Sequence, residues 1–258
     1  MRTRSIAAIF TAMAAGLIWL SAPPAAAQTQ TAPLRLLVSN GLKGSMEALH
    51  AQCEQEIGRR LAIQFGSTAS VKKRIEMGEA FDATFITVQA IDDLIERGAL
   101  ARPSRMNIGR SALGIGIRAG APRPDVRTPA ALKEALLKAR SITYPQDGAS
   151  RGDIESMFNR LGIAAEVKPK IILAPGSGPA TESVAAGKAA MVLTLFSEIL
   201  PIHGVEVLGP FPGEYQTDIR FAAAASVTSK NADAAKALIA YLAGPKVAPV
   251  LKAKGIDR

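Results

Sequence analysis

The sequence predicts an α/β protein with two lobes. Strand-like and helix-like segments alternate between residues 34 and 117, which is the order expected of parallel α/β units. A segment rich in Pro and Gly, RAGAPRPDVRTP at residues 118–129, then interrupts the pattern. The alternation begins again after it, and two alternating sets in one chain favour two lobes.

The first unit starts with a strand that passes directly into a helix. In the stretch LRLLVSNGLKGSMEALHAQCEQEIG, residues 34–58, an apolar run ends at Ser39-Asn40-Gly41. The residues after this turn place apolar side chains at steps of three and four, which is the spacing of one helix face. These side chains are Met46, Leu49, Cys53 and Ile57.

The other elements of the first unit are marked by short apolar runs and by glycines. The runs predict strands, and Gly78 and Gly98 are expected to end the two helices between them, as glycine often does at a helix C-terminus. The predicted strands are LAIQF (61–65), FDATFI (81–86) and SALGIGI (111–117).

The second unit begins at a helix start signal. Thr128 is a typical N-cap residue, and Pro129 suits the first helical position. Helices are expected after it, after Asp153 and after the loop APGSGP at residues 174–179. The predicted strands between them are SITY (141–144), KIIL (170–173), AAMVLTL (189–195) and VEVLG (205–209).

The C-terminal part adds a long strand and two helices. DIRFAAAASV, residues 218–227, has the apolar character of a buried strand. Asn231 is expected to cap a helix that carries Leu238, and Pro245 is expected to start the last helix.

The first residues have the pattern of a cleaved secretory signal. Arg2 and Arg4 precede the apolar run 6–20, and Ala25-Ala26-Ala27 has the small side chains of a signal peptidase site. A membrane anchor is the alternative, but the run is shorter than the roughly 18 residues that a span needs. The sequence therefore predicts a signal peptide at residues 1–27 and a mature protein that is exported to the periplasm.

Charge and cysteine content limit the classes of partner and cofactor. Without the two signal arginines, the 31 Lys and Arg residues still exceed the 22 Asp and Glu residues, and a mature charge of about +7 favours anionic partners. No aromatic-interleaved basic surface is present, so nucleic-acid binding is not expected.

Cys53 is the sole cysteine and lies on an apolar helix face, while His50 and His203 have no metal-ligand spacing. Neither a metal nor another cofactor is expected.

Three strand-to-helix turns carry the candidate ligand residues. In an open α/β sheet, ligands bind beyond the carboxyl ends of the strands, where helix N-termini present backbone N–H groups. One such turn is commonly only a helix cap, but three turns in two units favour a ligand site, and Thr194 adds a polar residue inside an apolar strand. The candidates are Ser39, Asn40, Gly41, Gly66, Ser67, Thr68, Ser150, Arg151 and Thr194.

The third turn also fits the nucleophile elbow of serine hydrolases. Residues 148–152, GASRG, match G-x-S-x-G between a strand and a helix, and Glu182 or Glu198 precedes His203 in the order that a triad requires. An HGGG-type oxyanion segment is missing. A secreted serine hydrolase acting through Ser150 is therefore the alternative to a binding protein that is not an enzyme.

Long segments of the chain resemble a known family. Residues 38–86, including the turn FGSTAS, together with VAAGKAAMVLTLFSEILPIHGVEVLGPFP and SVTSKNADAAKALIAYLAGPKVAPVLKAKGI, are similar to periplasmic molybdate-binding proteins and related extracellular solute-binding proteins. The resemblance implies the class II periplasmic binding fold, in which two crossing strands join two α/β lobes. Lobe one would comprise residues 28–117 and 217–258, and lobe two would comprise residues 118–216.

The resemblance also implies a function and a ligand site. A soluble monomer would capture a small anion in the cleft and deliver it to the membrane subunits of an ABC transporter. Ser39, Ser67 and Thr68 match hydroxyl positions of the family, whereas Asn40 stands where a second small hydroxyl residue is common. Arg151 departs from the neutral donors of a molybdate site, and an arginine can pair bidentately with a carboxylate. Both a molybdate-like oxyanion and a small organic acid are therefore expected ligands.

Overall fold

Nine strands form a mixed sheet in residues 32–258, which are the residues that the computed structural model describes. The predicted signal peptide lies outside these residues. The strand order is β2-β1-β3-β9-β4-β7-β5-β6, and β8 pairs with β4. The strands are β1 (Leu34–Ser39), β2 (Leu61–Gly66), β3 (Ala83–Thr87), β4 (Met106–Arg118), β5 (Ile142–Pro145), β6 (Ile171–Ala174), β7 (Met191–Leu195), β8 (Val205–Pro210) and β9 (Asp218–Ala225).

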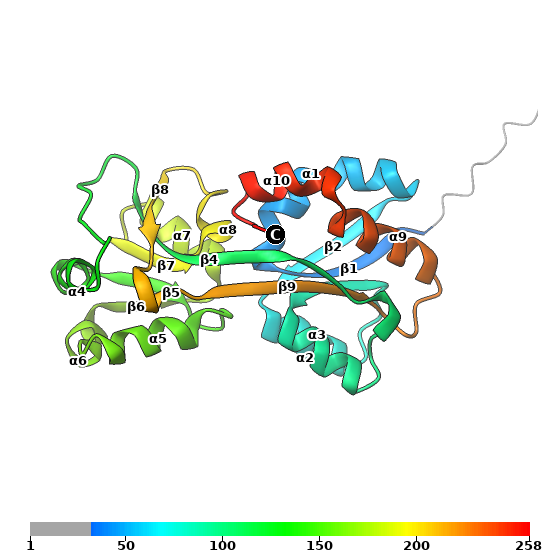
Figure 1. The fold of residues 1–258 in the computed structure, drawn as a ribbon, viewed down its shortest axis with the longest axis horizontal. Helices are drawn as coiled ribbons and strands as arrows, with labels where there is room; N and C mark the ends of the chain where they lie inside the picture. Colours follow the sequence, from blue (N-terminus) through cyan, green and yellow to red (C-terminus); the bar gives the residue numbers. More distant parts are fainter. Residues whose placement is uncertain (1–31) are drawn as a thin grey trace, which may run out of the picture. The chain divides into compact units, whose positions relative to one another are not determined.

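The long strand β4 belongs to two parts of this sheet. Residues Met106–Ala112 pair with β9, and residues Leu113–Arg118 pair with β7 and β8. We call β1, β2, β3, β9 and the start of β4 the first half-sheet, and the rest of the strands the second half-sheet. Figure 1 shows β4 and β9 running side by side between the two groups of helices.

Helices cover both faces of each half-sheet (Figure 1). In the first half-sheet, α1, α9 and α10 pack on one face and α2 and α3 on the other, and each face has its own apolar core. In the second half-sheet, α4, α5 and α6 lie opposite α7 and α8. The helices are α1 (Lys43–Ile57), α2 (Thr68–Glu76), α3 (Val88–Glu96), α4 (Pro129–Lys138), α5 (Arg151–Arg160), α6 (Ala164–Val167), α7 (Ser177–Ala185), α8 (Phe196–Ile199), α9 (Ala232–Ala243) and α10 (Ala248–Ala253).

The glycine at position 114 in β4 lets the short helix α8 lie close to the sheet. A Cβ at Gly114 would overlap the ring of Phe196, the first residue of α8. Because α8 follows directly after β7, this close approach fixes where the next side chains of α8 lie. One of them is Glu198, which reaches the cavity described below.

Most of the predicted elements are confirmed. Strand β4 starts at Met106, five residues before the predicted strand at 111–117, and the last two helices begin in a different way from the prediction. Asn231 occupies the N-cap position of α9, but its side chain does not cap the helix. Its amide instead donates to Asp82 and its carbonyl accepts from Arg59. At Pro245, the chain first forms the 3-10 turn Pro245–Val247, and α10 begins after it. Cys53 is buried as predicted, and burial together with the charge of Glu56 raises the pKa of its thiol to about 12.

The helices of the described part are short for membrane spans. Within residues 32–258, no single helix is long and apolar enough to cross a membrane. One bent pair, Ala232–Ala243 with Pro245–Ala253, reaches the required length and composition only when taken together.

Candidate functional site

The carboxyl ends of five strands meet around a small cavity. Strands β1 and β2 reach it from the first half-sheet, and β5, β6 and β7 reach it from the second. The cavity measures about 20 Å³, and a water needs roughly 10–15 Å³, so little more than one water fits. The lining residues are Ser39, Asn40, Ser67, Thr68, Pro145, Asp147, Gly148, Ala149, Ser177, Leu195, Glu198 and Phe221.

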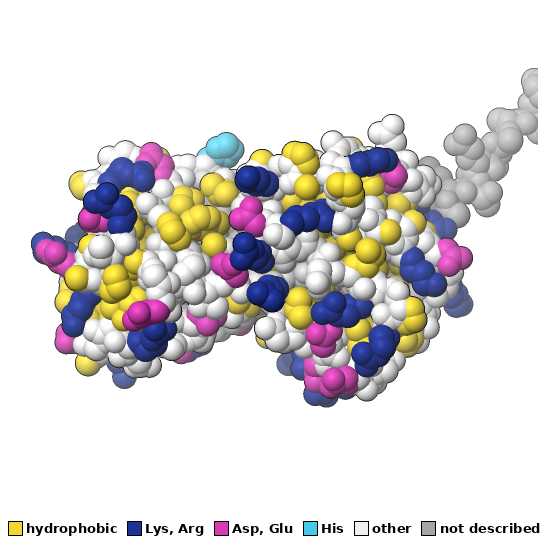
Figure 2. Space-filling model, viewed as in Figure 1, with side chains coloured by type: hydrophobic (Ala, Val, Ile, Leu, Met, Phe, Trp, Pro, Cys, Tyr) yellow, Lys and Arg dark blue, Asp and Glu magenta, His cyan; other side chains and the backbone are white. Residues whose placement is uncertain are grey.

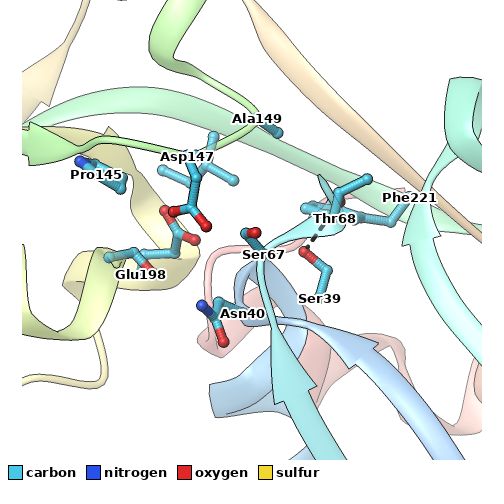
Figure 3. A pocket seen from close by; sticks show the side chains of 12 residues that line it. Ser39, Asn40, Ser67, Thr68, Pro145, Asp147, Ala149, Glu198 and Phe221 are labelled. Atoms are coloured by element: carbon cyan, nitrogen blue, oxygen red, sulfur yellow. Dashed lines mark hydrogen bonds between the residues drawn. The ribbon is translucent and has the colours of Figure 1, made fainter. Parts of the chain in front are cut away.

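Two predicted turns supply the wall that belongs to the first half-sheet. Ser39 accepts a hydrogen bond from the backbone N–H of Gly41 at 3.4 Å, and Thr68 Oγ1 donates to Ser39 Oγ at 3.5 Å (Figure 3). Ser67 caps α2 by accepting from Ser70 N–H at 3.1 Å. These hydroxyl groups therefore hold helix starts in place while they face the cavity.

Two predicted glycines lie behind this wall rather than in it. Gly41 and Gly66 do not line the cavity, although Ser39, Asn40 and Ser67 beside them do. A Cβ at Gly41 would come within 2.5 Å of the ring of Phe221. Gly41 therefore lets this ring, which does line the cavity, pack against the turn.

The third predicted turn reaches the cavity through residues other than the expected ones. Asp147, Gly148 and Ala149 line it, whereas Ser150 and Arg151 do not. Ser150 is only 1% exposed. The Arg151 guanidinium donates to Glu155 Oε1 at 2.8 Å and to the Gln146 carbonyl at 2.7 Å. Ser150 and Arg151 therefore do not line the cavity, because the chain passes it before α5 begins, and their contact with a ligand stays a prediction.

Thr194 does not line the cavity itself, but it contacts Glu198, which does. Thr194 is fully buried, and its hydroxyl donates to Glu198 Oε2. Burial raises the pKa of the Glu198 carboxyl, and the nearby charge of Asp147 raises it further. Hydrogen bonds from Thr194, Ser177 and the Leu195 backbone oppose this shift without cancelling it. The Glu198 carboxyl therefore holds its proton to a higher pH than an exposed glutamate does.

Two acidic side chains share the cavity. Figure 3 shows the carboxyl groups of Asp147 and Glu198 pointing toward one another from the second half-sheet. Among the described residues that line the cavity, none is Lys, Arg or His. An anion that enters must therefore meet hydroxyl, amide and backbone donors together with the carboxyl group of Glu198, whose pKa is raised by burial.

A larger hollow adjoins the cavity. It measures about 260 Å³ and shares Asn40, Ser177 and Glu198 with the cavity. Its charged residues are Lys43, Glu47 and Glu182 besides Glu198, and Lys43 pairs with Glu47 at 2.9 Å. Glu198 therefore lies where the closed cavity meets open space.

The geometry does not support the hydrolase alternative. A nucleophilic serine needs an exposed hydroxyl group and a histidine within hydrogen-bond reach. Ser150 is buried, and in residues 32–258 its side chain makes no hydrogen bond to His50 or His203. His203 lies exposed in the turn between α8 and β8. The residues around Ser150 therefore form no acyl-transfer site in the described part of the chain.

Several cavity residues are not among those that the sequence predicts. The most important are Asp147, Ser177 and Glu198, which follow β5, β6 and β7. The rule that ligands bind beyond strand ends points to all three positions, although only some strand ends carry an obvious polar turn. Nothing in the sequence indicates that the Glu198 side chain turns toward the cavity.

Comparison with known proteins establishes the class of protein. Residues 34–257 match the model of a family described as bacterial extracellular solute-binding protein, and the chain belongs to this family. The fold also matches a solved structure, the periplasmic molybdate-binding protein of Azotobacter vinelandii. That comparison has a TM-score of 0.74 at 20% identity and covers 87% of this chain and 99% of the other.

Two relatives of known function cover almost the whole chain. An aconitate isomerase from Pseudomonas sp is 27% identical over 249 residues, which are 95% of each protein. The molybdate-binding protein ModA of Azotobacter vinelandii is 25% identical over 257 residues, which are 97% of each protein. The chain is thus similar both to a molybdate-binding protein and to an enzyme, an aconitate isomerase.

Proposed function

We propose that this protein is the periplasmic solute-binding component of an ABC-type importer and that it captures a small anion in the cavity. The observation that carries this proposal is the cavity itself, where donors from both half-sheets converge beyond the strand ends. Membership of the solute-binding family supports the same role. The expected partners are the anion and the membrane subunits of the transporter.

We further propose that the two half-sheets act as the two lobes of a class II periplasmic binding fold. The change of pairing partner along β4 supports a boundary between Ala112 and Leu113, with the second crossing near Thr217. On β4, this boundary lies five residues before the one that the sequence predicts, which falls between Ile117 and Arg118. The small volume of the cavity supports a closed state, so binding of a ligand would require the lobes to open and close again.

The chemistry of the cavity favours an anion that arrives with a proton. Neutral hydroxyl and amide donors suit molybdate as well as a carboxylate, and Glu198 can present a protonated carboxyl group. Screening molybdate, tungstate, sulfate, phosphate, citrate and both isomers of aconitate by thermal shift tests the proposal, since a ligand of the native state raises its melting temperature. If no anion raised the melting temperature at any pH between about 5 and 8, the proposal would be wrong.

Replacing Ser67 with Ala is expected to weaken binding of the best anion by about 1 kcal/mol, or about fivefold in Kd, because one neutral donor is lost. Arg151→Ala is expected to leave Kd unchanged, because its guanidinium is engaged with Glu155 and the Gln146 carbonyl. Isothermal titration of both variants measures the two effects. A large loss in Arg151→Ala alone would mean that the ligand lies elsewhere.

A second candidate function is isomerisation of an unsaturated carboxylic acid. The pair Asp147 and Glu198 favours it, because the two carboxyl groups face one another and burial raises the pKa of Glu198, so that they can divide the roles of base and acid. One carboxylate would take a proton from the carbon beside the double bond, and a carboxyl group would return a proton to the far end of the resulting allylic anion. The similarity to an aconitate isomerase supports the same chemistry.

Proton NMR of the protein with cis-aconitate or trans-aconitate in D2O tests this activity. Interconversion with deuterium uptake is expected in the wild type and should be lost in Glu198→Gln. Arg151→Ala serves as a control that should keep the activity. Tight binding of aconitate without any interconversion would support the binding function and exclude isomerase activity.

A further inference from the structure

Two arginines face each other across the paired strands β4 and β9. In the antiparallel register, Arg110 lies directly opposite Arg220. Like charges directly opposite on neighbouring strands destabilise a sheet, because their side chains leave the same face close together. A fold that keeps such a pair on the two strands that run between its halves suggests a compensating ligand.

The protein's own carboxylates balance only part of this charge. Arg110 Nη1 lies 2.7 Å from Asp218 Oδ2. Arg105, next to β4, forms a bidentate pair with Asp92 at 2.5 and 3.2 Å. Within residues 32–258, no carboxylate lies within 4.0 Å of the Arg220 guanidinium. Arg220 therefore remains an uncompensated positive charge beside two paired ones.

These three arginines line one hollow. It measures about 430 Å³ and also includes Asn107, Phe221 and Arg258, and small-molecule sites measure roughly 300–1,000 Å³. The guanidinium of Arg258 already donates to the carbonyls of Leu242 and Gly244, so it has less capacity for a ligand. Figure 2 shows Lys and Arg side chains gathered over the middle of β4 and β9.

We propose that this hollow is a second binding site, for a small multivalent anion of the phosphate or polycarboxylate class. Guanidinium groups present planar pairs of N–H donors that match these oxygens bidentately. A bound anion with two or more charges would offset the repulsion between Arg110 and Arg220, and the amide of Asn107 offers a neutral contact. The site lies apart from the acidic cavity, and the two share only Phe221.

Isothermal titration with inorganic pyrophosphate tests the proposal on the mature protein. Wild type is expected to bind pyrophosphate at a site that Arg220→Ala weakens at least tenfold, with partial recovery in Arg220→Lys. Ser67→Ala should leave this binding unchanged. Thermal unfolding adds a second readout: without anion, Arg220→Ala should melt at a higher temperature than wild type, because the like-charge pair is gone.

Arg140→Ala is the matched control, because it removes the same charge from an exposed position outside the hollow. It should retain wild-type affinity for pyrophosphate and should not melt at a higher temperature. Equal affinity of Arg220→Ala and wild type would overturn the proposal. A loss of pyrophosphate binding in Ser67→Ala would also overturn it, because the anion would then occupy the acidic cavity.

Discussion

Replacing Glu198 with Gln is expected to remove the pH dependence of anion binding. If each anion binds together with one proton on Glu198, the wild-type affinity should fall about tenfold per pH unit above the pKa of this group. The glutamine side chain cannot ionise and keeps an N–H donor, so the affinity of the variant should stay level and exceed that of the wild type at high pH. Isothermal titration between about pH 5 and 8, in buffers of different ionisation enthalpy, counts the protons taken up.

Asp147→Asn is the matched control for this experiment. It removes the neighbouring negative charge but leaves Glu198 free to ionise, so affinity should rise while a dependence on pH remains. The other charged groups near Glu198, which are Lys43, Glu47 and Glu182, are unchanged in both variants. A wild-type affinity that does not vary with pH would show that Glu198 takes no proton when the ligand binds.

Glu198→Gln should also change the free energy of unfolding, and the sign of this change follows from the raised pKa of Glu198. The folded state binds the Glu198 proton more tightly than the unfolded state. The contribution of this proton to the free energy of unfolding is therefore complete below the ordinary glutamate pKa of 4.5. That contribution is lost as pH rises through the folded-state pKa. Glu198→Gln should therefore be more stable than wild type at high pH, and this advantage should disappear toward a pH of about 4.

Replacing Asp82 with Ala is expected to lower the free energy of unfolding by about 3 to 5 kcal/mol. The Asp82 side chain is fully buried and accepts from Arg35 N–H at 2.8 Å, Ser229 Oγ at 2.7 Å and Asn231 Nδ2 at 3.1 Å. The substitution leaves these donors without their acceptor. Urea unfolding at about pH 7 measures the loss. The ion pair with Arg35 adds little, because the Arg35 side chain is 47% exposed.

The pH dependence of this loss of stability separates the effect of the Asp82 charge from the effect of the side chain's shape. Burial alone would raise the pKa of Asp82, but the hydrogen bonds from Arg35, Ser229 and Asn231 lower it overall. The contribution of the Asp82 carboxylate to the free energy of unfolding is present above its ordinary pKa of 3.8. It is lost as the pH falls through the lowered pKa of Asp82 in the folded state. Asp82→Asn keeps the shape and should lose this dependence. If Asp82→Ala unfolded at the same urea concentration as wild type, the network would not contribute to stability.

The fold followed from local patterns, because most strands here are short apolar runs with turn residues at their ends. The wall formed by Ser39 and Ser67 was predicted for the same reason, since the residue after a buried strand lies at the sheet edge. Ser150 and Arg151 do not line the cavity, because a strand end shows where a turn lies but not which of its residues faces the cavity. Asp147, Gly148 and Ala149, which precede α5, occupy that place instead.

Glu198 was beyond prediction for a different reason. It lies on α8, a single turn of helix that has no periodic pattern to reveal which face is buried. Its position depends on Gly114, which is far away in the sequence and which allows Phe196 to approach the sheet. Likewise, the pairing of Arg110 with Arg220 depends on the register of two strands that are far apart in the chain.

The place of β9 in the sheet sets the order in which the two half-sheets can fold as the chain becomes available from its N-terminus. All strands of the second half-sheet lie within one continuous stretch, from Leu113 to Pro210, so that part can assemble early. The first half-sheet cannot, because β9 lies between β3 and β4 and is made last of all the strands. The first half-sheet must therefore stay incomplete until β9, near the C-terminus, is available to pair with β3 and β4.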